Sequence, residues 1–557
     1  MFRKLWLASL LLSGATACVY AADDFAEIQS KIVCFTLDNG LTVILYPRGD
    51  APVISCVTYV KAGSVNEHVG ITGIAHQLEH LAFKGTASIG TKDYAAEKPL
   101  FVEIDKLYAV IQEIEQRMPA EVREAFLSLL AKLTSTGGAA ALAKLDADLA
   151  ALQPAWEKVG FKLKDEEKAA LAAQVKAYAE KVNSAEKFVE QNQYSNLIDR
   201  NGGVGLNAFT SDDRTVYHVS IPANKLELWA ALESDRFMNL VPRQLEKEKQ
   251  VVLEERRMRS DSEGFGKLYE AFLSVAFTAH PYGVPVIGWR SDILGYTRGK
   301  IERFYQSQYR PSNTIVSIAG DIDIEKTKKI VADYFGKLPK AAAPERPLTV
   351  EPPQEGERRV EVEFPTQPAL LIGYHIPERN HPDTPALEMM EEIATSGRTS
   401  RFYSHLVKTG KANSVGSWIG PGSLYPRLLF ISGEPPKGVS TEELEAGIFA
   451  EVEKLKAEPP TADEMKRVLT RYRASVLRGL KSNLGLAQEL ADYQALSGDW
   501  HNLFRDIQRM SAVTPEQVTA VASKYLTKQN RTVGRVVSTS GAQEAPGAES
   551  IFGMPVK

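Results

Sequence analysis

The segment His76-Gln77-Leu78-Glu79-His80 constrains this chain more than any other part of its sequence. Two histidines four positions apart project from one face of an α-helix, which is the spacing that lets two imidazoles share a metal ion. Glu79 lies beside the same face. A zinc ion held by three protein ligands keeps a position open for water, and a neighbouring carboxylate can accept a proton from that water. The segment therefore predicts a helix with a hydrolytic zinc site, in which His76 and His80 are ligands and Glu79 is the general base.

The pattern is specific for a chain of this composition. Only 9 of the 557 residues are histidine. The five-residue pattern is therefore expected by chance about 0.01 times per chain of this composition. The competing interpretation is a structural helix that carries two histidines without a metal. A third ligand on another element decides between the two, because a catalytic zinc needs three protein donors.

The best source of that ligand is the segment from Glu248 to Glu255, a strong helix former whose Val and Leu residues can pack in a core. Glu248 and Glu255 are seven positions apart and so share a helix face two turns apart. One of them can bind zinc while the other holds a ligand histidine in place. The competing interpretation is a set of solvated surface glutamates. Spacing alone does not choose between Glu254 and Glu255 as the ligand.

The surrounding sequence predicts an α+β chain with two related halves. Residues 337–358 are rich in Pro, Ala and charge, which is typical of an interdomain linker. Before the linker, β-rich runs precede the histidine helix, and the first two are separated by Asp38-Asn39-Gly40, a strong hairpin signal. After it, the order of strand, strand and helix begins again. The β-rich runs of the first half are 32–37, 41–46 and 53–61. In the second half the strands are 359–364 and 369–375, and the helix starts at about Thr384.

The second half lacks histidines at the equivalent helix. If residues 75–85 are laid on residues 387–397, then Glu388, Glu391 and Glu392 take the places of His76, Glu79 and His80. We therefore expect no second zinc site.

Residues from about 99 to 198 have a different texture, dominated by Ala, Leu, Glu and Lys with apolar residues at helical spacing. We expect a long helical insertion in the first half. It can be a packing appendage, or it can act in gating, substrate capture or partner docking.

The first 21 residues resemble a secretory signal, with Arg3 and Lys4, an apolar run over 5–17, and a cleavage site at Val19-Tyr20-Ala21. That run is too short to span a membrane, so we expect a secreted, periplasmic protein without a transmembrane segment. A lipoprotein acylated at Cys18 is the alternative. Pairing of Cys34 with Cys56 stays open.

The formal net charge of −4 comes from 66 Lys and Arg against 70 Asp and Glu. This balance gives no electrostatic argument for nucleic acid or for an anionic membrane.

Four segments, in the order in which they occur, resemble the core motifs of the pitrilysin/insulinase (M16) metallopeptidases. They are 73–86 around the histidines, 205–211, 251–258 and His280-Pro281-Tyr282-Gly283. The resemblance implies a fold of two related α+β halves, one zinc ion per chain and endopeptidase activity. It also implies that Glu255 is the third ligand and Glu248 the supporting carboxylate. Asn207 and Ala208 match the edge strand on which family members bind peptide substrates.

Three features depart from the family pattern. The helical block widens the separation of His80 and Glu255 to 175 residues, Gln77 replaces an apolar residue, and Val407 and Ser414 stand where many members carry an Arg and a Tyr that hold the substrate backbone. We expect a second M16-like subunit to supply that contact.

The leading hypothesis is thus a zinc-dependent endopeptidase that hydrolyses extended peptides or small unfolded proteins. A non-catalytic M16-like scaffold or binding subunit of a hetero-oligomer is the alternative, and a protein that only sequesters zinc or peptide is a third. The intact site residues favour catalysis. The expected domains are a signal peptide (1–21), a catalytic domain (25–340) with its insertion, a linker (341–358) and a C-terminal domain without metal (359–557).

Overall fold

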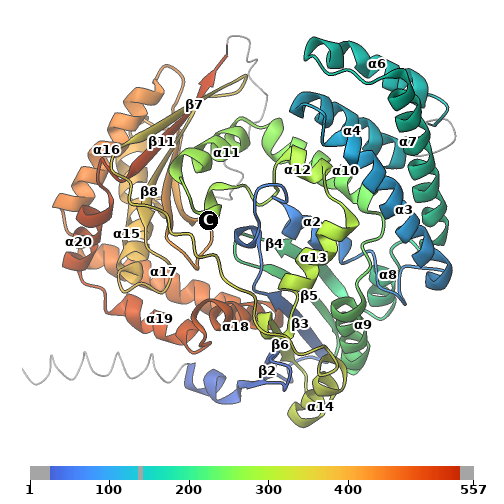
Figure 1. Cartoon of the computed structure of the whole chain (residues 1–557). Coiled ribbons are helices and arrows are strands. Elements are labelled where there is room, and N and C mark those ends of the chain that lie inside the picture. The colour runs from blue at the N-terminus through green and yellow to red at the C-terminus, as the bar shows by residue number, and fades with distance from the viewer. Residues whose placement is uncertain (1–24, 136–141, 540–557) are drawn as a thin grey trace, which may run out of the picture.

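The computed structural model describes residues 25–135 and 142–539. Two sheets, one in each half of the chain, form its framework (Figure 1). The first sheet has the order β1-β2-β6-β3-β5-β4 and the second the order β7-β11-β8-β10-β9. The strands of the first sheet are β1 (Val33–Thr36), β2 (Thr42–Pro47), β3 (Val53–Val60), β4 (Val204–Thr210), β5 (Thr215–Pro222) and β6 (Thr314–Gly320). Those of the second are β7 (Arg358–Phe364), β8 (Ala369–Ile376), β9 (Ser414–Gly420), β10 (Arg427–Glu434) and β11 (Arg531–Ser538).

The two sheets share one topology once the edge strand β1 is set aside. In each, the first strand runs parallel to the last strand of its half, β2 with β6 and β7 with β11, and the other pairs are antiparallel. β4 and β9 occupy the equivalent free edges. The fold is therefore α+β with two related halves, as the restart of the strand and helix pattern after the linker predicts.

Helices cover both sheets. In the first half they are α2 (Ile74–Leu81), α3 (Tyr94–Glu115), α4 (Ala120–Ser135), α6 (Leu145–Lys158), α7 (Asp165–Ala185), α8 (Gln193–Arg200), α9 (Leu226–Asn239), α10 (Leu245–Arg256), α11 (Gly264–Ala276), α12 (Arg290–Leu294), α13 (Arg298–Gln308) and α14 (Ile324–Phe335). In the second half they are α15 (Thr384–Thr395), α16 (Thr441–Ala457), α17 (Ala462–Lys481), α18 (Asn483–Ser497), α19 (Asn502–Ser511) and α20 (Pro515–Tyr525).

Each half places one helix on the sheet of the other. α18 of the second half packs on β3 and β6, and α11 of the first half packs on β7 and β11. The first contact buries Leu486 and Leu490 against Val57 and Ile315. The second buries Phe272 in a cluster with Val536 of β11, which Phe430 of the neighbouring strand β10 also joins. This exchange of apolar surface fixes the two halves against each other, although residues 339–357 between them form neither helix nor strand.

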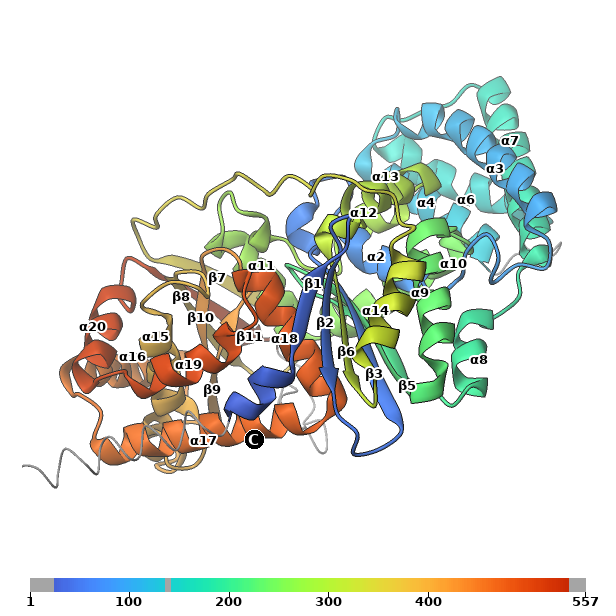
Figure 2. The same cartoon turned by 90° about the horizontal axis from the view of Figure 1, so that it is seen from below.

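The helical block of the first half runs from α3 to α8. Helices α3 to α7 stand apart from the sheets, whereas α8 contacts β4 (Figure 2). It begins at Tyr94, slightly earlier than expected, and α4 packs directly on α10 and α12. The Arg243 side chain, just before α10, donates two 2.9 Å hydrogen bonds to the Glu97 carboxylate of α3, and both side chains are completely buried. The block is thus anchored to the helix that carries Glu248 and Glu255.

Cys34 and Cys56 are both free thiols. They lie on β1 and β3, which two other strands separate. Three interstrand spacings amount to about 14 Å, too far for a disulfide. No helix among the described residues is both long and apolar enough to cross a membrane.

Candidate metal centre

The start of α2 is held by two carboxylates from outside the helix. Glu67 accepts hydrogen bonds from the backbone N–H groups of Gly73 (2.6 Å) and Ala75 (2.8 Å), two donors that the helix itself leaves unpaired. Asp292 of α12 accepts from the N–H groups of Gly70 and Thr72 at 3.0 Å. Gly73 has a φ of +86°, and a Cβ there would lie 2.4 Å from a backbone oxygen. These contacts fix where the histidine helix begins and how it is turned.

His76 and His80 leave α2 on the same side, with their ring centres 4.8 Å apart. The Nε2 atoms of both rings lie 3.6 Å from one carboxylate oxygen of Glu255. That separation is long for a hydrogen bond. Ligand atoms bound at about 2.1 Å to one tetrahedral zinc ion lie about 3.4 Å apart, so the three donors fit a shared ion. In residues 25–135 and 142–539, no other group of His, Cys, Asp and Glu side chains converges in this way.

Glu254 and Glu255 differ sharply in where they point. The Glu254 side chain is 54% exposed and binds Arg257 at 2.7 Å, whereas that of Glu255 is 16% exposed and faces the two histidines. The structure therefore brings Glu255 to the site and leaves Glu254 outside it. Arg259 contacts the second oxygen of Glu255 at 2.7 Å, a partner that the sequence did not indicate.

Glu248 lies two turns before Glu255 on the same face of α10, and it contacts the other nitrogen of His80. Its carboxylate is 3.4 Å from His80 Nδ1 and 2.6 Å from the Lys84 ammonium. Burial raises the pKa of Glu248, but the contacts with His80 and Lys84 outweigh it and leave that pKa below its usual value. The carboxylate is thus charged, and it fixes the tautomer in which His80 Nε2 is free to bind a metal.

The two histidines differ in their electrostatic surroundings. Burial, with the nearby His80 and Arg259, lowers the pKa of His76 to about 3, so that this ring is neutral and ready to act as a ligand. Burial also lowers the pKa of His80, but Glu248, Glu79 and Glu255 raise it more. A proton therefore competes with a metal ion for His80 more strongly than for His76.

Glu79 completes the centre from the last turn of α2. Its carboxylate accepts a 2.6 Å hydrogen bond from the Thr210 hydroxyl, at the end of β4. Burial raises the pKa of Glu79 above its usual value, which suits a group that takes up and returns a proton. Nothing in the spacing of the sequence pointed to Thr210.

The edge strand β4 forms one wall of the site. Asn207 and Ala208 lie on it beside a cavity of about 830 Å³, which His76, Glu79, His80 and Glu255 also line. Among the residues that the structure describes, β4 pairs with β5 alone, so its outer edge offers unpaired backbone groups to an extended chain. The apolar side chains of Val251 and Met258 also line this cavity and are 48% and 54% exposed.

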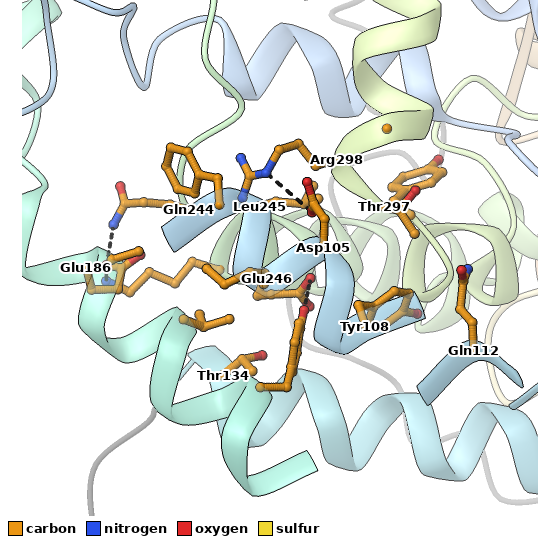
Figure 3. A pocket seen from close by; sticks show the side chains of 18 residues that line it. Asp105, Tyr108, Gln112, Thr134, Glu186, Gln244, Leu245, Glu246, Thr297 and Arg298 are labelled. Atoms are coloured by element: carbon orange, nitrogen blue, oxygen red, sulfur yellow. Dashed lines mark hydrogen bonds and ion pairs between the residues drawn. The ribbon is translucent and has the colours of Figure 1, made fainter. Parts of the chain in front are cut away.

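A second cavity, of about 220 Å³, lies between the helical block and the start of α10 (Figure 3). None of His76, His80 and Glu255 lines it. Tyr178 of α7 donates a 3.1 Å hydrogen bond to Glu246, and Glu186 accepts from Gln244 and Lys247 at 2.9 and 3.0 Å. The block therefore contacts the first turn of α10 from several directions.

The second half carries carboxylates at the matching helix. Glu391 of α15 accepts a hydrogen bond from Ser417 of β9, and Glu392 forms a 3.1 Å ion pair with Arg471. Val407 packs against the core of this half, and Ser414 opens β9 with a buried hydroxyl that lacks a partner among the described residues.

Family models describe the same architecture. Residues 43–98 and 180–288 match the model for insulinase (peptidase family M16), and residues 295–472 match the model for the peptidase M16 inactive domain. The chain belongs to the M16 peptidase family. The part of the first half that the insulinase model skips, residues 99–179, lies within the helical block.

Relatives within M16 are named as zinc proteases. The chain is 31% identical to zinc protease PqqE of Helicobacter pylori over 510 residues, which is 88% of each protein. It is 27% identical to an uncharacterised zinc protease of Mycobacterium leprae over 344 residues, covering 60% of this chain and 75% of that one.

Solved structures share the fold. A protease from Helicobacter pylori superposes with a TM-score of 0.69 at 24% identity, covering 91% of this chain and 99% of that one. The periplasmic protease PqqL from Escherichia coli gives a TM-score of 0.60 at 15% identity, covering 93% of this chain. This M16 chain spans only 49% of PqqL.

Proposed function

We propose that this M16 chain is a secreted, periplasmic zinc-dependent endopeptidase that hydrolyses extended peptides or small unfolded proteins. The observation that carries the proposal is the convergence of His76, His80 and Glu255 on one point, with Glu79 alongside. The donor set of two imidazoles and one carboxylate favours zinc over harder divalent ions. The zinc-protease names of the relatives support the same metal.

Each side chain of the centre has a distinct task. When bound, zinc lowers the pKa of a water molecule and polarises a carbonyl. His76, His80 and Glu255 hold the ion, and Glu248 keeps the His80 ring in its binding orientation. Glu79 accepts the proton of the attacking water and returns it to the leaving amine. Asn207 and Ala208 present the β4 edge, on which a substrate can add as a further strand beside the metal donors.

The chain is proposed to divide into four segments. We assign residues 1–21 to a signal peptide, 25–340 to the catalytic domain with its helical block, 341–358 to the linker and 359–557 to a C-terminal domain that binds no metal. The irregular backbone of residues 341–357 and the absence of histidine donors from α15 support this assignment.

A second M16-like subunit would supply the side chains that hold the substrate backbone. Val407 and Ser414 offer no cation or phenol for a peptide backbone, and PqqL is about twice as long as this chain. A chain of this length can therefore supply one half of a larger assembly. Size-exclusion chromatography with light scattering, with and without substrate peptide, tests for pairing of two copies.

The metal assignment is tested by comparing Glu255→Gln with Glu254→Gln, two changes of identical chemistry on neighbouring residues. We expect the Glu255 variant to lose bound zinc and peptide cleavage, while the Glu254 variant keeps both. Equal zinc content in the two variants would contradict the assignment of the third ligand. Zinc binding without cleavage of any peptide by the unaltered chain would instead favour the scaffold or binding-subunit alternative.

A further inference from the structure

α17 has an unusually one-sided distribution of charge. At 100° per residue, all six of its cationic side chains fall within about 160° of the helix circumference. The buried side chains of Met465, Val468 and Leu480 lie outside this arc. The helix has two acidic residues, both in its first turn. Glu464 pairs with Arg401, and Asp463 falls within the same arc as the cations but at the N-terminal end of the helix. The cationic residues, called here the basic stripe, are Lys466, Arg467, Arg471, Arg473, Arg478 and Lys481.

Most of the basic stripe is not neutralised within the protein. Arg471 pairs with Glu392 at 3.1 Å, and Arg473 donates to the Ser511 hydroxyl. Lys466, Arg467, Arg478 and Lys481 are exposed and have no acidic partner among the described residues. A helix of 20 residues is about 30 Å long, so these four charges form an extended row. The net charge of −4 for the whole chain conceals this local excess.

We propose that the basic stripe of α17 docks this protein on an anionic phospholipid surface. A cluster of four to eight Lys and Arg side chains on an amphipathic helix is typical of binding to anionic membrane surfaces. Leu477 lies within the same arc and is 42% exposed, so it can add an apolar contact. A second copy of the chain is a poor occupant, because isologous pairing would set like charges against each other.

The path of the chain favours a membrane over an acidic protein. Phe25 and Ile28, in the helix over residues 25–31, share an apolar cluster with Leu480 of α17 and Phe504 of α19. Figure 2 shows α17 along the lower edge of the molecule, close to this first helix. Seven residues, 18–24, separate Phe25 from the apolar run over 5–17, and the eight Cα–Cα steps across them can reach about 28 Å. A bilayer that holds that run, as a leader or as an anchor, therefore comes within reach of the basic stripe.

The test is vesicle co-sedimentation with the chain from Ala22 onward. This form keeps every described residue but lacks the apolar run, which could hold vesicles by itself. We expect at 50 mM salt at least about tenfold stronger partitioning onto vesicles of 30% phosphatidylglycerol in phosphatidylcholine than onto pure phosphatidylcholine. The preference should weaken at 500 mM salt.

Matched variants assign the effect to α17. We expect Lys466→Glu/Arg467→Glu/Arg478→Glu/Lys481→Glu to abolish the preference for anionic vesicles. We expect the same number of reversals on the helical block, Lys158→Glu/Lys162→Glu/Lys164→Glu/Lys176→Glu, to preserve it. The four-fold glutamine variant at the α17 positions replaces the glutamate variant if the latter fails to fold, as judged by thermal unfolding. Peptide cleavage should be unchanged in all of them, so failure here is distinguishable from failure of the proposed activity.

Three results would overturn the proposal. They are equal partitioning of the unaltered chain onto both kinds of vesicle, an equal loss in the helical-block variant, and binding to polyglutamate without any preference for anionic vesicles. The last result would assign the basic stripe to an acidic protein partner.

Discussion

The Thr210 hydroxyl donates a 2.6 Å hydrogen bond to the Glu79 carboxylate and so joins the edge strand β4 to α2, the helix that carries His76 and His80. The second half repeats this arrangement, with Ser417 of β9 donating to Glu391 of α15. Both halves thus connect their edge strand to the equivalent helix through a hydroxyl and a carboxylate, yet only the first has histidines. In the first half this contact sets the direction of the proposed base relative to the strand on which substrate is proposed to bind.

Replacing Thr210 with valine should lower kcat while zinc stays bound. The hydrogen bond to a charged group is worth about 1.5–3 kcal/mol, so we expect a loss of about tenfold to a hundredfold. Thr210→Ser keeps the hydroxyl and should restore most of the activity. Steady-state kinetics with one fluorogenic peptide, together with zinc analysis, checks this. Equal activity of the valine and serine variants would show that the contact does not position Glu79.

Glu248→Gln should weaken zinc binding without removing a ligand. The change neutralises the partner of His80 Nδ1. It also removes the counter-charge of the Lys84 ammonium, which lies 2.6 Å from the Glu248 carboxylate in the unaltered chain. Loss of such a supporting carboxylate typically costs about tenfold to a hundredfold in metal affinity. Competition with a zinc chelator measures the affinity. Glu254→Gln is the control, and an effect of equal size there would argue against a specific role of Glu248.

Glu97→Gln should destabilise the first half. Glu97 and Arg243 are both completely buried, and breaking a buried ion pair from one side leaves an uncompensated charge that costs about 3–5 kcal/mol. Because Arg243 immediately precedes α10, zinc affinity should fall as well. Urea unfolding with and without zinc measures both effects. A loss below about 1 kcal/mol would mean that the helical block does not brace α10 through this pair.

Glu391→Gln should change how stability depends on pH. Burial raises the pKa of Glu391 to about 8, above the value of 4.5 expected in the unfolded chain. The folded state therefore binds the proton more tightly, so this group stabilises the fold fully below pH 4.5 and loses its contribution as pH rises through 8. Between pH 5 and pH 8 the Tm should fall less for the glutamine variant than for the unaltered chain. Parallel Tm curves for the two proteins would contradict this account.

The two-half α+β fold could be predicted from the sequence because its signals are local. The Asn39-Gly40 turn, the apolar periodicity of the helical block and the restart after residue 358 each depend on neighbouring residues. The exchange of α11 and α18 between the sheets could not be predicted. It depends on packing between residues such as Leu490 and Ile315, which are 175 positions apart. The hydrophobic periodicity of a single helix or strand does not indicate which distant element it packs against.

The candidate metal centre could likewise be predicted only in part from the sequence. Helical spacing alone places His76 and His80 on one face, but it treats Glu254 and Glu255 alike, because the choice depends on how α10 is rotated against α2. The contacts of Glu67, Asp292 and Thr210 join separate elements and have no signature in any one of them. The roles of these residues become visible only once the chain is folded.

In the proposed reaction, Glu79 moves the proton for peptide hydrolysis at a zinc ion. The most direct measurement compares the unaltered chain with Glu79→Gln for cleavage of a mixed peptide library, with zinc content determined in both. We predict cleavage by the unaltered chain and a loss of at least about a hundredfold in the variant, with zinc bound equally in the two. Cleavage at an undiminished rate by the zinc-loaded variant would contradict this role of Glu79.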